Sequence, residues 1–278
     1  MEATHRRDWH PRLADPSGRR TGKPRTEGLT MVIDKGLGFR AFEDLLESAA
    51  PYIDMLKIGF GTSPLYPEKL LREKIERAKA NGICIYPGGT FLEVAISQGV
   101  IDDYFDRVIE LGFNGIEISN GTIDFGRGLR NRLIARAVEE NLTVITEYGK
   151  KSRGSTIELP ELVNTIMLDL EFGSSLVTIE GRESGTGVGI YDDNGECNDE
   201  LVERIARHIP NRHVLMWEAP QKAQQVHLMK KLGTDINIGN VPPQDVIALE
   251  ALRRGLRSDT FSCAAAGAAD ARSAPRCP

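Results

Sequence analysis

The sequence predicts an α/β protein with a single (β/α)8 barrel domain, the TIM-barrel fold. Eight short runs rich in Val and Ile alternate with eight amphipathic segments, and this repeat of about 30 residues continues for about 230 residues of the 278-residue chain. A doubly wound open sheet, the competing architecture, usually has five or six strands and would leave the last units unexplained. The 40% hydrophobic and 27% charged residues are typical of a globular protein rather than a disordered chain.

The expected strands are short and almost continuously apolar. This pattern is typical of parallel strands that are buried on both faces, because helices cover the outer face and other strands the inner one. The eight runs are Leu29–Asp34, Ile53–Gly59, Ile83–Tyr86, Gly115–Ser119, Thr143–Glu147, Leu176–Glu180, His213–Glu218 and Asp235–Gly239.

The intervening segments have the apolar spacing of amphipathic helices. Several begin with a helix-start signal, such as Pro67, Asp199 and the pair Pro242-Pro243. The eight expected helices are Phe42–Ala49, Glu68–Ala80, Ile101–Leu111, Leu129–Glu140, Leu159–Phe172, Asn198–His208, Gln221–Leu232 and Pro243–Arg254.

Both ends of the chain fall outside the repeat. Residues 1–26 are polar, lack the apolar segment of a secretory signal, and carry Asp8 and Asp15, which are untypical of a transit peptide. We expect them to form a polar arm on the surface of the barrel, which takes residues 27–261. The Ala-rich residues 262–278 have no amphipathic pattern and are expected to form a flexible tail.

Composition restricts the possible partners. The net charge of −5 gives no support for nucleic-acid binding, which normally needs a strongly basic face. No apolar run approaches the roughly 20 residues that cross a bilayer. The four cysteines include no CxxC pair, so we expect a reduced, cytoplasmic protein.

The candidate site follows from the fold, because active sites of (β/α)8 barrels lie at the carboxyl ends of the strands. Four consecutive expected strands carry a glutamate there: Glu117, Glu147, Glu180 and Glu218. Like charges facing one cavity repel unless they are neutralised, and Mg²⁺ binds carboxylate oxygens well. The alternative is that each glutamate forms an ion pair with a nearby Lys or Arg.

Basic residues occupy the same strand ends. Lys35, Lys57, Lys150 and Arg182 form a set suited to a substrate with several negative charges. Gly239 and Asn240 precede the last helix, in the region where such barrels often bind phosphate on backbone N–H groups.

Eight motifs in this order resemble the phosphosulfolactate synthase family, which also includes plant heat-stress-associated homologues. The resemblance covers residues 27–261. The motifs are Gly28–Gly36, Lys57–Ser63, Tyr86–Thr90, Glu117–Gly121, Thr146–Lys151, Ile179–Gly185, Glu218–Lys222 and Leu252–Phe261.

The resemblance implies a Mg²⁺-dependent barrel, a carbon–sulfur lyase that adds sulfite to phosphoenolpyruvate. The product would be (2R)-2-phospho-3-sulfolactate, formed through an enediolate-like intermediate, and in archaea this reaction opens a route to coenzyme M. The family is also thought to assemble as homo-oligomers. Two other functions stay open: a non-catalytic or stress-related barrel that binds another protein, and a lyase or aldolase acting on another enol phosphate.

The resemblance also implies residue roles. Lys150, in the family's Glu-x-Gly-Lys-Lys motif, would protonate C2 of the substrate, with Glu147 and Lys57 as further catalytic residues. Metal ligands would come from Glu147, Glu180, Glu218 and Asp34. Lys35, Lys57 and Arg182 would bind the phosphate, the carboxylate and the incoming sulfite, beside the phosphate site expected at Gly239 and Asn240 from the barrel architecture.

Overall fold

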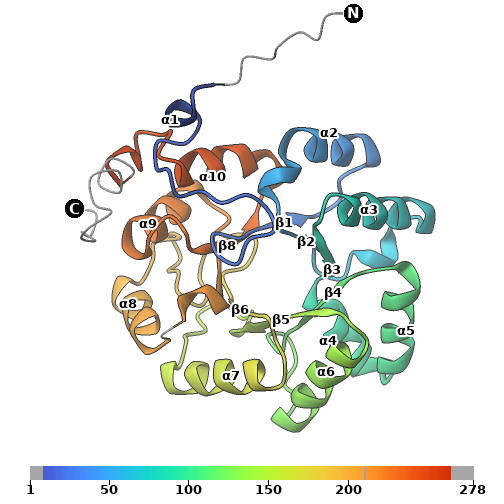
Figure 1. Cartoon of the computed structure of the whole chain (residues 1–278). Coiled ribbons are helices and arrows are strands. Elements are labelled where there is room, and N and C mark those ends of the chain that lie inside the picture. The colour runs from blue at the N-terminus through green and yellow to red at the C-terminus, as the bar shows by residue number, and fades with distance from the viewer. Residues whose placement is uncertain (1–8, 210, 264–278) are drawn as a thin grey trace, which may run out of the picture.

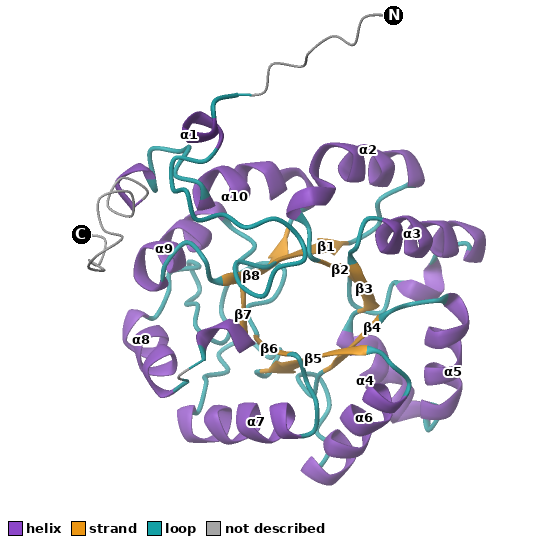
Figure 2. Ribbon diagram, in the orientation of Figure 1, coloured by secondary structure: helices purple, strands orange, loops and turns teal. Residues whose placement is uncertain are grey.

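The computed structural model describes residues 9–209 and 211–263, and in these residues the (β/α)8 barrel is confirmed (Figures 1 and 2). Eight parallel strands form the inner ring and helices form the outer layer. The strands are β1 (Thr30–Asp34), β2 (Met55–Ile58), β3 (Cys84–Pro87), β4 (Gly115–Ile118), β5 (Thr143–Tyr148), β6 (Leu176–Ile179), β7 (Leu215–Glu218) and β8 (Asn237–Val241).

All eight expected helices are present, with ends displaced by a few residues. They are α2 (Phe39–Ala49), α3 (Glu68–Ala80), α5 (Ile101–Leu111), α6 (Arg127–Glu139), α7 (Leu159–Glu171), α8 (Asp199–His208), α9 (Lys222–Leu232) and α10 (Val246–Arg253). The structure adds α1 (Pro11–Ala14) and α4 (Gly89–Gln98), and 3-10 turns at Ala50–Tyr52, Ser63–Leu65, Arg212–Val214 and Pro243–Asp245. The sequence did not predict α4, which begins directly after β3 and so lies at the carboxyl end of the barrel.

Between β3 and β4 a side chain, rather than a backbone ladder, supplies the hydrogen bonds that join the two strands. The hydrogen-bonded order is β3-β2-β1-β8-β7-β6-β5-β4, so the ladder stops between β3 and β4. Asn114, just before β4, accepts a hydrogen bond from the backbone N–H of Ile85 at 2.7 Å and donates to the carbonyl of Ile83 at 3.3 Å. Its amide therefore provides hydrogen bonds that a ladder would otherwise supply.

Successive residues of each strand face opposite sides of the sheet. One side forms the large core between sheet and helices, with Val32 and Leu56 among its residues. The other side fills the base of the barrel interior with Met31, Met55 and Met216. This alternation decides which strand-end side chains reach the site.

The amino-terminal arm packs across the end of the barrel opposite to the strands' carboxyl ends, and α1 lies beside α10 (Figure 1). Lys23 Nζ donates to the carbonyls of Ile53 at 2.5 Å and Asn81 at 3.0 Å, both just before a strand. Arg20 forms an ion pair with Glu250 of α10 at 3.0 Å. The expected tail lies, from residue 264 onward, outside the described residues.

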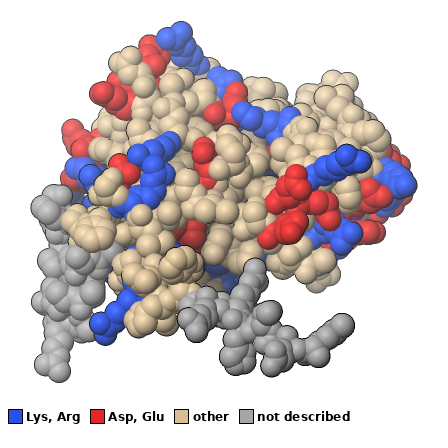
Figure 3. All heavy atoms as spheres, turned by 90° about the horizontal axis from the view of Figure 1, so that it is seen from above, with Lys and Arg blue, Asp and Glu red and all other residues tan. Residues whose placement is uncertain are grey.

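The outer surface carries both signs of charge, and acidic and basic residues are interspersed on the face shown in Figure 3. In residues 9–209 and 211–263, no helix is both long enough and apolar enough to cross a membrane.

Candidate active site

A cavity of about 460 Å³ opens at the carboxyl ends of the strands. Its wall combines strand ends, the first turn of α4 and the loop after β6. It is lined by Ile33, Lys57, Phe60, Gly88, Gly89, Thr90, Glu117, Thr122, Glu147, Lys151, Glu180, Arg182, Glu183, Glu218 and Asn240.

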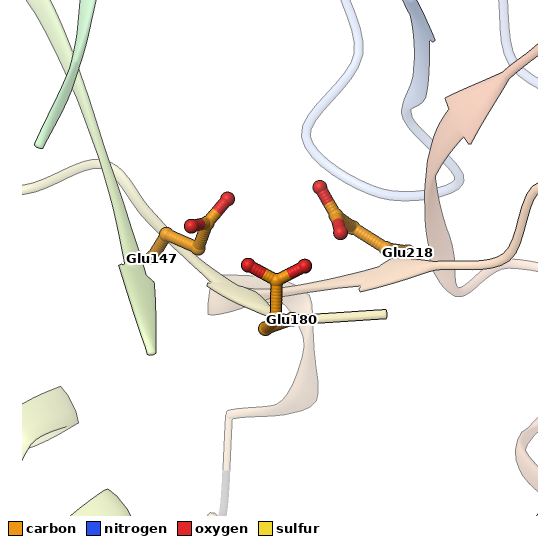
Figure 4. A group of neighbouring side chains, drawn as sticks. All are labelled: Glu147, Glu180 and Glu218. Atoms are coloured by element: carbon orange, nitrogen blue, oxygen red, sulfur yellow. The ribbon is translucent and has the colours of Figure 1, made fainter. Parts of the chain in front are cut away.

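Three buried glutamates converge in this cavity from β5, the end of β6, and β7 (Figure 4). Glu147, Glu180 and Glu218 each have a carboxylate oxygen within 4.8 Å of the corresponding oxygens of the other two. Each is at most 2% exposed. Oε2 of Glu180 accepts no hydrogen bond from the described part of the chain.

Lys57 is a buried cation beside this cluster. Its Nζ donates to Glu218 at 2.9 Å and to Glu117 at 3.1 Å, and lies 3.9 Å from Glu147. Burial alone would lower the pKa of Lys57, but Glu117 and Glu218 outweigh it and hold that pKa well above its ordinary value. Lys57 therefore stays charged and fixes the position of the glutamates around it.

Lys151 is the second cation of the cavity. Its Nζ lies 2.6 Å from Oε1 of Glu147 and 3.7 Å from carboxylate oxygens of both Glu93 and Glu180. Burial would lower the pKa of Lys151, but the charges of Glu147 and Glu180 raise it above its ordinary value. The side chain is 23% exposed, so the ammonium group remains reachable from the cavity.

The pKa values of Glu147 and Glu180 are shifted in opposite directions. Burial would raise the pKa of Glu147, but Lys151 and Lys57 lower it to about 2, so this carboxylate is ionised. Burial, together with the like charges of Glu147 and Glu218, raises the pKa of Glu180 well above its ordinary value. The positive charge of Lys151 thus does not fully compensate the negative charge of an ionised Glu180.

The charges of the site call for a further cation. Among the described residues, five buried carboxylates (Glu93, Glu117, Glu147, Glu180 and Glu218) are served by the two ammonium groups of Lys57 and Lys151. Oε2 of Glu180, which accepts no hydrogen bond from the described residues, and the close oxygens of Glu147 and Glu218 are hard ligands of the kind that Mg²⁺ prefers. The residues present therefore fit a divalent cation.

Two further predicted residues lie in the cavity. Asn240 is 2% exposed and its Oδ1 has no hydrogen-bond partner in the described residues. Its backbone is left-handed (φ 54°), and the register of β8 against β1 shifts close by, an irregularity that turns the side chain inward. Arg182 lines the mouth and donates from Nη1 to the carbonyl of Lys151 at 3.1 Å.

Asp34 lies at a strand end but faces away from the cavity. The preceding residue, Ile33, lines the cavity, so Asp34 points to the outer side of the sheet. There it forms a fully buried ion pair with Lys74 and accepts from the backbone N–H groups of Gly36 and Leu37 at 2.9 and 2.8 Å. The structure therefore does not bring Asp34 to the three glutamates as a fourth ligand.

Three other predicted residues also lie apart from the cavity wall. The Nζ of Lys150 donates to the carbonyl of Asn120 at 3.0 Å, and its side chain is 47% exposed. Lys35 is exposed. Gly239 lies below the cavity, where an added Cβ would be 2.9 Å from Cε of Met31.

Two residues of the site, Lys151 and Glu93, were not predicted from the sequence. In an extended strand every second side chain faces the same side, so Glu147 and Lys151 would share a face if the strand continued past Tyr148. Extending the alternation in this way would have indicated Lys151. Glu93 lies in the unpredicted α4, where it accepts from Ser119 Oγ at 2.6 Å and from the N–H groups of Thr122 and Ile123 at 2.7 and 2.6 Å. A lone acidic residue within an apolar stretch was the available signal.

The fold and the site define a (β/α)8 barrel with a cavity at the carboxyl ends of its strands. The buried lysines and glutamates of this cavity are typical of an enzyme active site. Residues 18–259 match the family described as (2R)-phospho-3-sulfolactate synthase (ComA). A phosphosulfolactate synthase of Methanothermobacter thermautotrophicus is 42% identical over 244 residues, which is 87% of this chain and 94% of that protein. The chain belongs to the phosphosulfolactate synthase family.

The similarity extends to bacterial and plant proteins. A phosphosulfolactate synthase of Bacillus subtilis is 38% identical over 87% of this chain and 95% of its own length. Protein HEAT-STRESS-ASSOCIATED 32 of Arabidopsis thaliana is 26% identical over 110 residues, 38% of each chain. The two synthases are thus matched over nearly their whole length, and the plant protein over a part.

Proposed function

We propose that this protein catalyses the Mg²⁺-dependent addition of sulfite to phosphoenolpyruvate, giving (2R)-2-phospho-3-sulfolactate. One observation carries the proposal: a reachable ammonium group, that of Lys151, lies in one cavity with three converging carboxylates. A cation-binding cluster beside a proton donor is what an addition to an unsaturated carboxylate requires.

Mg²⁺ would be held by Glu147, Glu180 and Glu218. When bound, the ion supplies positive charge that stabilises negative charge developing on the carboxylate of the substrate. Lys57 is hydrogen-bonded to Glu218 and Glu117, so it keeps two of the acidic side chains in fixed positions.

The other anionic groups of the substrates have positive partners in the same cavity. Gly88, Gly89 and Thr90 lie at the amino-terminal end of α4, where the helix dipole favours a phosphate group. A Cβ on Gly88 would lie 2.8 Å from the backbone of Phe60, so a side chain there would disturb this wall. Arg182 at the mouth suits the incoming sulfite or the phosphate.

The chemical step uses residues of the chain as follows. The sulfur lone pair of sulfite forms a bond to C3, and the π electrons of the C2–C3 double bond move toward C2 and the carboxylate. Lys151 then donates a proton from Nζ to C2, and a proton from bisulfite or water restores the ammonium form. We assign this role to Lys151 rather than Lys150 because Lys150 does not line the cavity.

The test is a direct assay. Purified protein is mixed with phosphoenolpyruvate, sulfite and Mg²⁺, and loss of the enol absorbance is followed with and without EDTA. We expect loss that depends on sulfite and stops with the chelator. If phosphoenolpyruvate raises the Tm of the protein but is not consumed, the nucleophile is not sulfite. The proposal would be contradicted if phosphoenolpyruvate were neither bound nor consumed.

A further inference from the structure

A second cavity, of about 250 Å³, lies at the opposite end of the barrel, between the amino-terminal arm and α10. It is lined by Ser17, Arg19, Arg20, Thr21, Glu27, Thr234, Asp235 and Arg253. The proposed reaction uses none of these residues, so the cavity needs an explanation of its own.

Arg253 is a buried cation in the wall of this cavity. It is 2% exposed, and its Nη1 donates to the carbonyls of Thr234 and Ile236, both at 2.8 Å. Its Nη2 donates to the carbonyl of Leu29 at 3.0 Å, while Nε has no hydrogen-bond partner in the described part of the chain. No carboxylate of residues 9–209 and 211–263 lies within ion-pair distance of this guanidinium, whose charge is therefore poorly compensated.

A second guanidinium lies next to it. A Cβ on Gly28 would lie 2.5 Å from Nη1 of Arg20 and 3.4 Å from Nη1 of Arg253. Arg20 shares its counter-ion, Glu250, with Arg254, and Nη2 of Arg20 has no partner among the described residues. Burial, with the charge of Arg20, lowers the pKa of Arg253 to about 9, which agrees with an excess of positive charge here.

We propose that this cavity binds a small oxyanion of the phosphate class. Arginine is the side chain best suited to such groups, because its planar N–H fork matches their oxygens. Arg19 and the hydroxyl of Thr21 are exposed beside the buried pair and complete the donor set.

The two acidic residues of the cavity wall, Glu27 and Asp235, do not prevent the binding of an anion. Glu27 is 44% exposed and already pairs with His213 at 3.3 Å. Asp235 is exposed as well. Water screens both charges, whereas the positive charge of Arg253 is buried and screened much less.

Occupancy would have a structural effect. The anion would bridge Arg19 and Arg20 of the arm to Arg253 of α10, so binding should hold the arm against the barrel. The ligand would thus stabilise the intact chain and protect the arm from proteases.

The experiment uses the full chain and inorganic phosphate in a chloride buffer. Phosphate binding is measured by calorimetry, and cleavage within residues 9–26 by limited proteolysis. The background is Arg182→Gln, which removes an anion-binding group from the active-site cavity. In it, we expect phosphate to bind and to slow cleavage of the arm.

Two substitutions in that background test the location. Arg19→Gln changes an exposed side chain and should weaken phosphate binding several-fold, and Arg253→Lys, which removes the Nε donor, should weaken it about tenfold or more. If Arg253→Lys does not fold, Arg19→Gln decides. Phosphate affinity unchanged by Arg19→Gln and by a folded Arg253→Lys, or absent at millimolar phosphate, would overturn the proposal.

A second experiment replaces phosphate with phosphoenolpyruvate. If Arg19→Gln weakens the binding of both ligands, a phosphate ester can occupy the site. Binding of phosphate alone would mean that the cavity admits only the free anion. Both results support an oxyanion site, and they distinguish a free phosphate ion from a phosphate ester as its ligand.

Discussion

The ammonium group of Lys151 lies 2.6 Å from the carboxylate of Glu147, whereas the ammonium group of the adjacent Lys150 contacts the carbonyl of Asn120 outside the active-site cavity. Two neighbouring lysines thus have different surroundings. The ammonium group of Lys151 lies within 4 Å of three buried carboxylates, those of Glu93, Glu147 and Glu180, whereas the side chain of Lys150 is half exposed.

Lys151→Met should abolish most of the turnover, while Lys150→Met should leave it within a few-fold of the original. A positioned acid contributes about 10²–10⁴-fold to a rate, and of these two lysines Lys151 lines the cavity whereas Lys150 does not. The measurement is kcat for sulfite-dependent consumption of phosphoenolpyruvate, with circular dichroism as the check on folding. A folded Lys151→Met protein with normal kcat would exclude Lys151 as the proton donor.

Glu180→Gln should remove the stabilisation that Mg²⁺ confers. Oε2 of Glu180 accepts no hydrogen bond from the described residues and lies in the carboxylate cluster, and a neutral amide is a weaker metal ligand. Without metal, the variant should be as stable as the original protein or more so, because burial and like charges oppose ionisation of Glu180. Thermal unfolding with and without Mg²⁺ measures both effects.

The matched control is Glu196→Gln, a substitution at an exposed glutamate in the loop before α8. It should leave both the metal-free Tm and its rise with Mg²⁺ unchanged. An undiminished rise in the Glu180→Gln protein would mean that the cation binds elsewhere.

Glu93→Gln should loosen the loop after β4 and reduce turnover. Oε2 of Glu93 accepts both backbone N–H bonds, from Thr122 and Ile123, and Oε1 accepts from Ser119 and lies 3.7 Å from Nζ of Lys151. The NH2 group of an amide would therefore face donors on either side. We expect a loss of about 1–3 kcal/mol in the free energy of unfolding. Denaturant titration checks this, with the exposed Glu76→Gln as the control; equal stability of the two variants would contradict the assigned contacts.

Glu250→Gln should weaken the docking of the arm at neutral pH but not in acid. Although burial raises the pKa of Glu250, hydrogen bonds from Arg20 and Arg254 outweigh burial and lower it. A lowered pKa means that Glu250 contributes stability above its unfolded-state value of about 4.3, and that this contribution is lost as the pH falls through the lower folded-state pKa.

The difference in Tm between the original protein and Glu250→Gln should therefore be largest near pH 7 and shrink below about pH 4. The measurement is a series of thermal unfolding curves from pH 3 to pH 8. A difference that stays constant over that range would show that the charge of Glu250 is not what matters.

The sequence by itself determined the architecture and the chemistry of the strand ends. Alternating apolar runs and amphipathic segments give eight strands and eight helices, and this order brings Glu117, Glu147, Glu180 and Glu218 to one end of a barrel. Such local periodicities are readable because each element needs its own pattern of buried residues.

The tertiary structure alone decided which strand-end residues share the cavity. Both faces of a barrel strand are buried, so hydrophobicity does not reveal that Ile33 faces inward and Asp34 outward. The inward turn of Asn240 depends on an irregular register between β8 and β1. Glu93 and the buried Arg253 likewise acquire their partners from elements distant in the chain, and so does Lys151 in its contacts with Glu93 and Glu180. The order of residues within one element does not record such contacts.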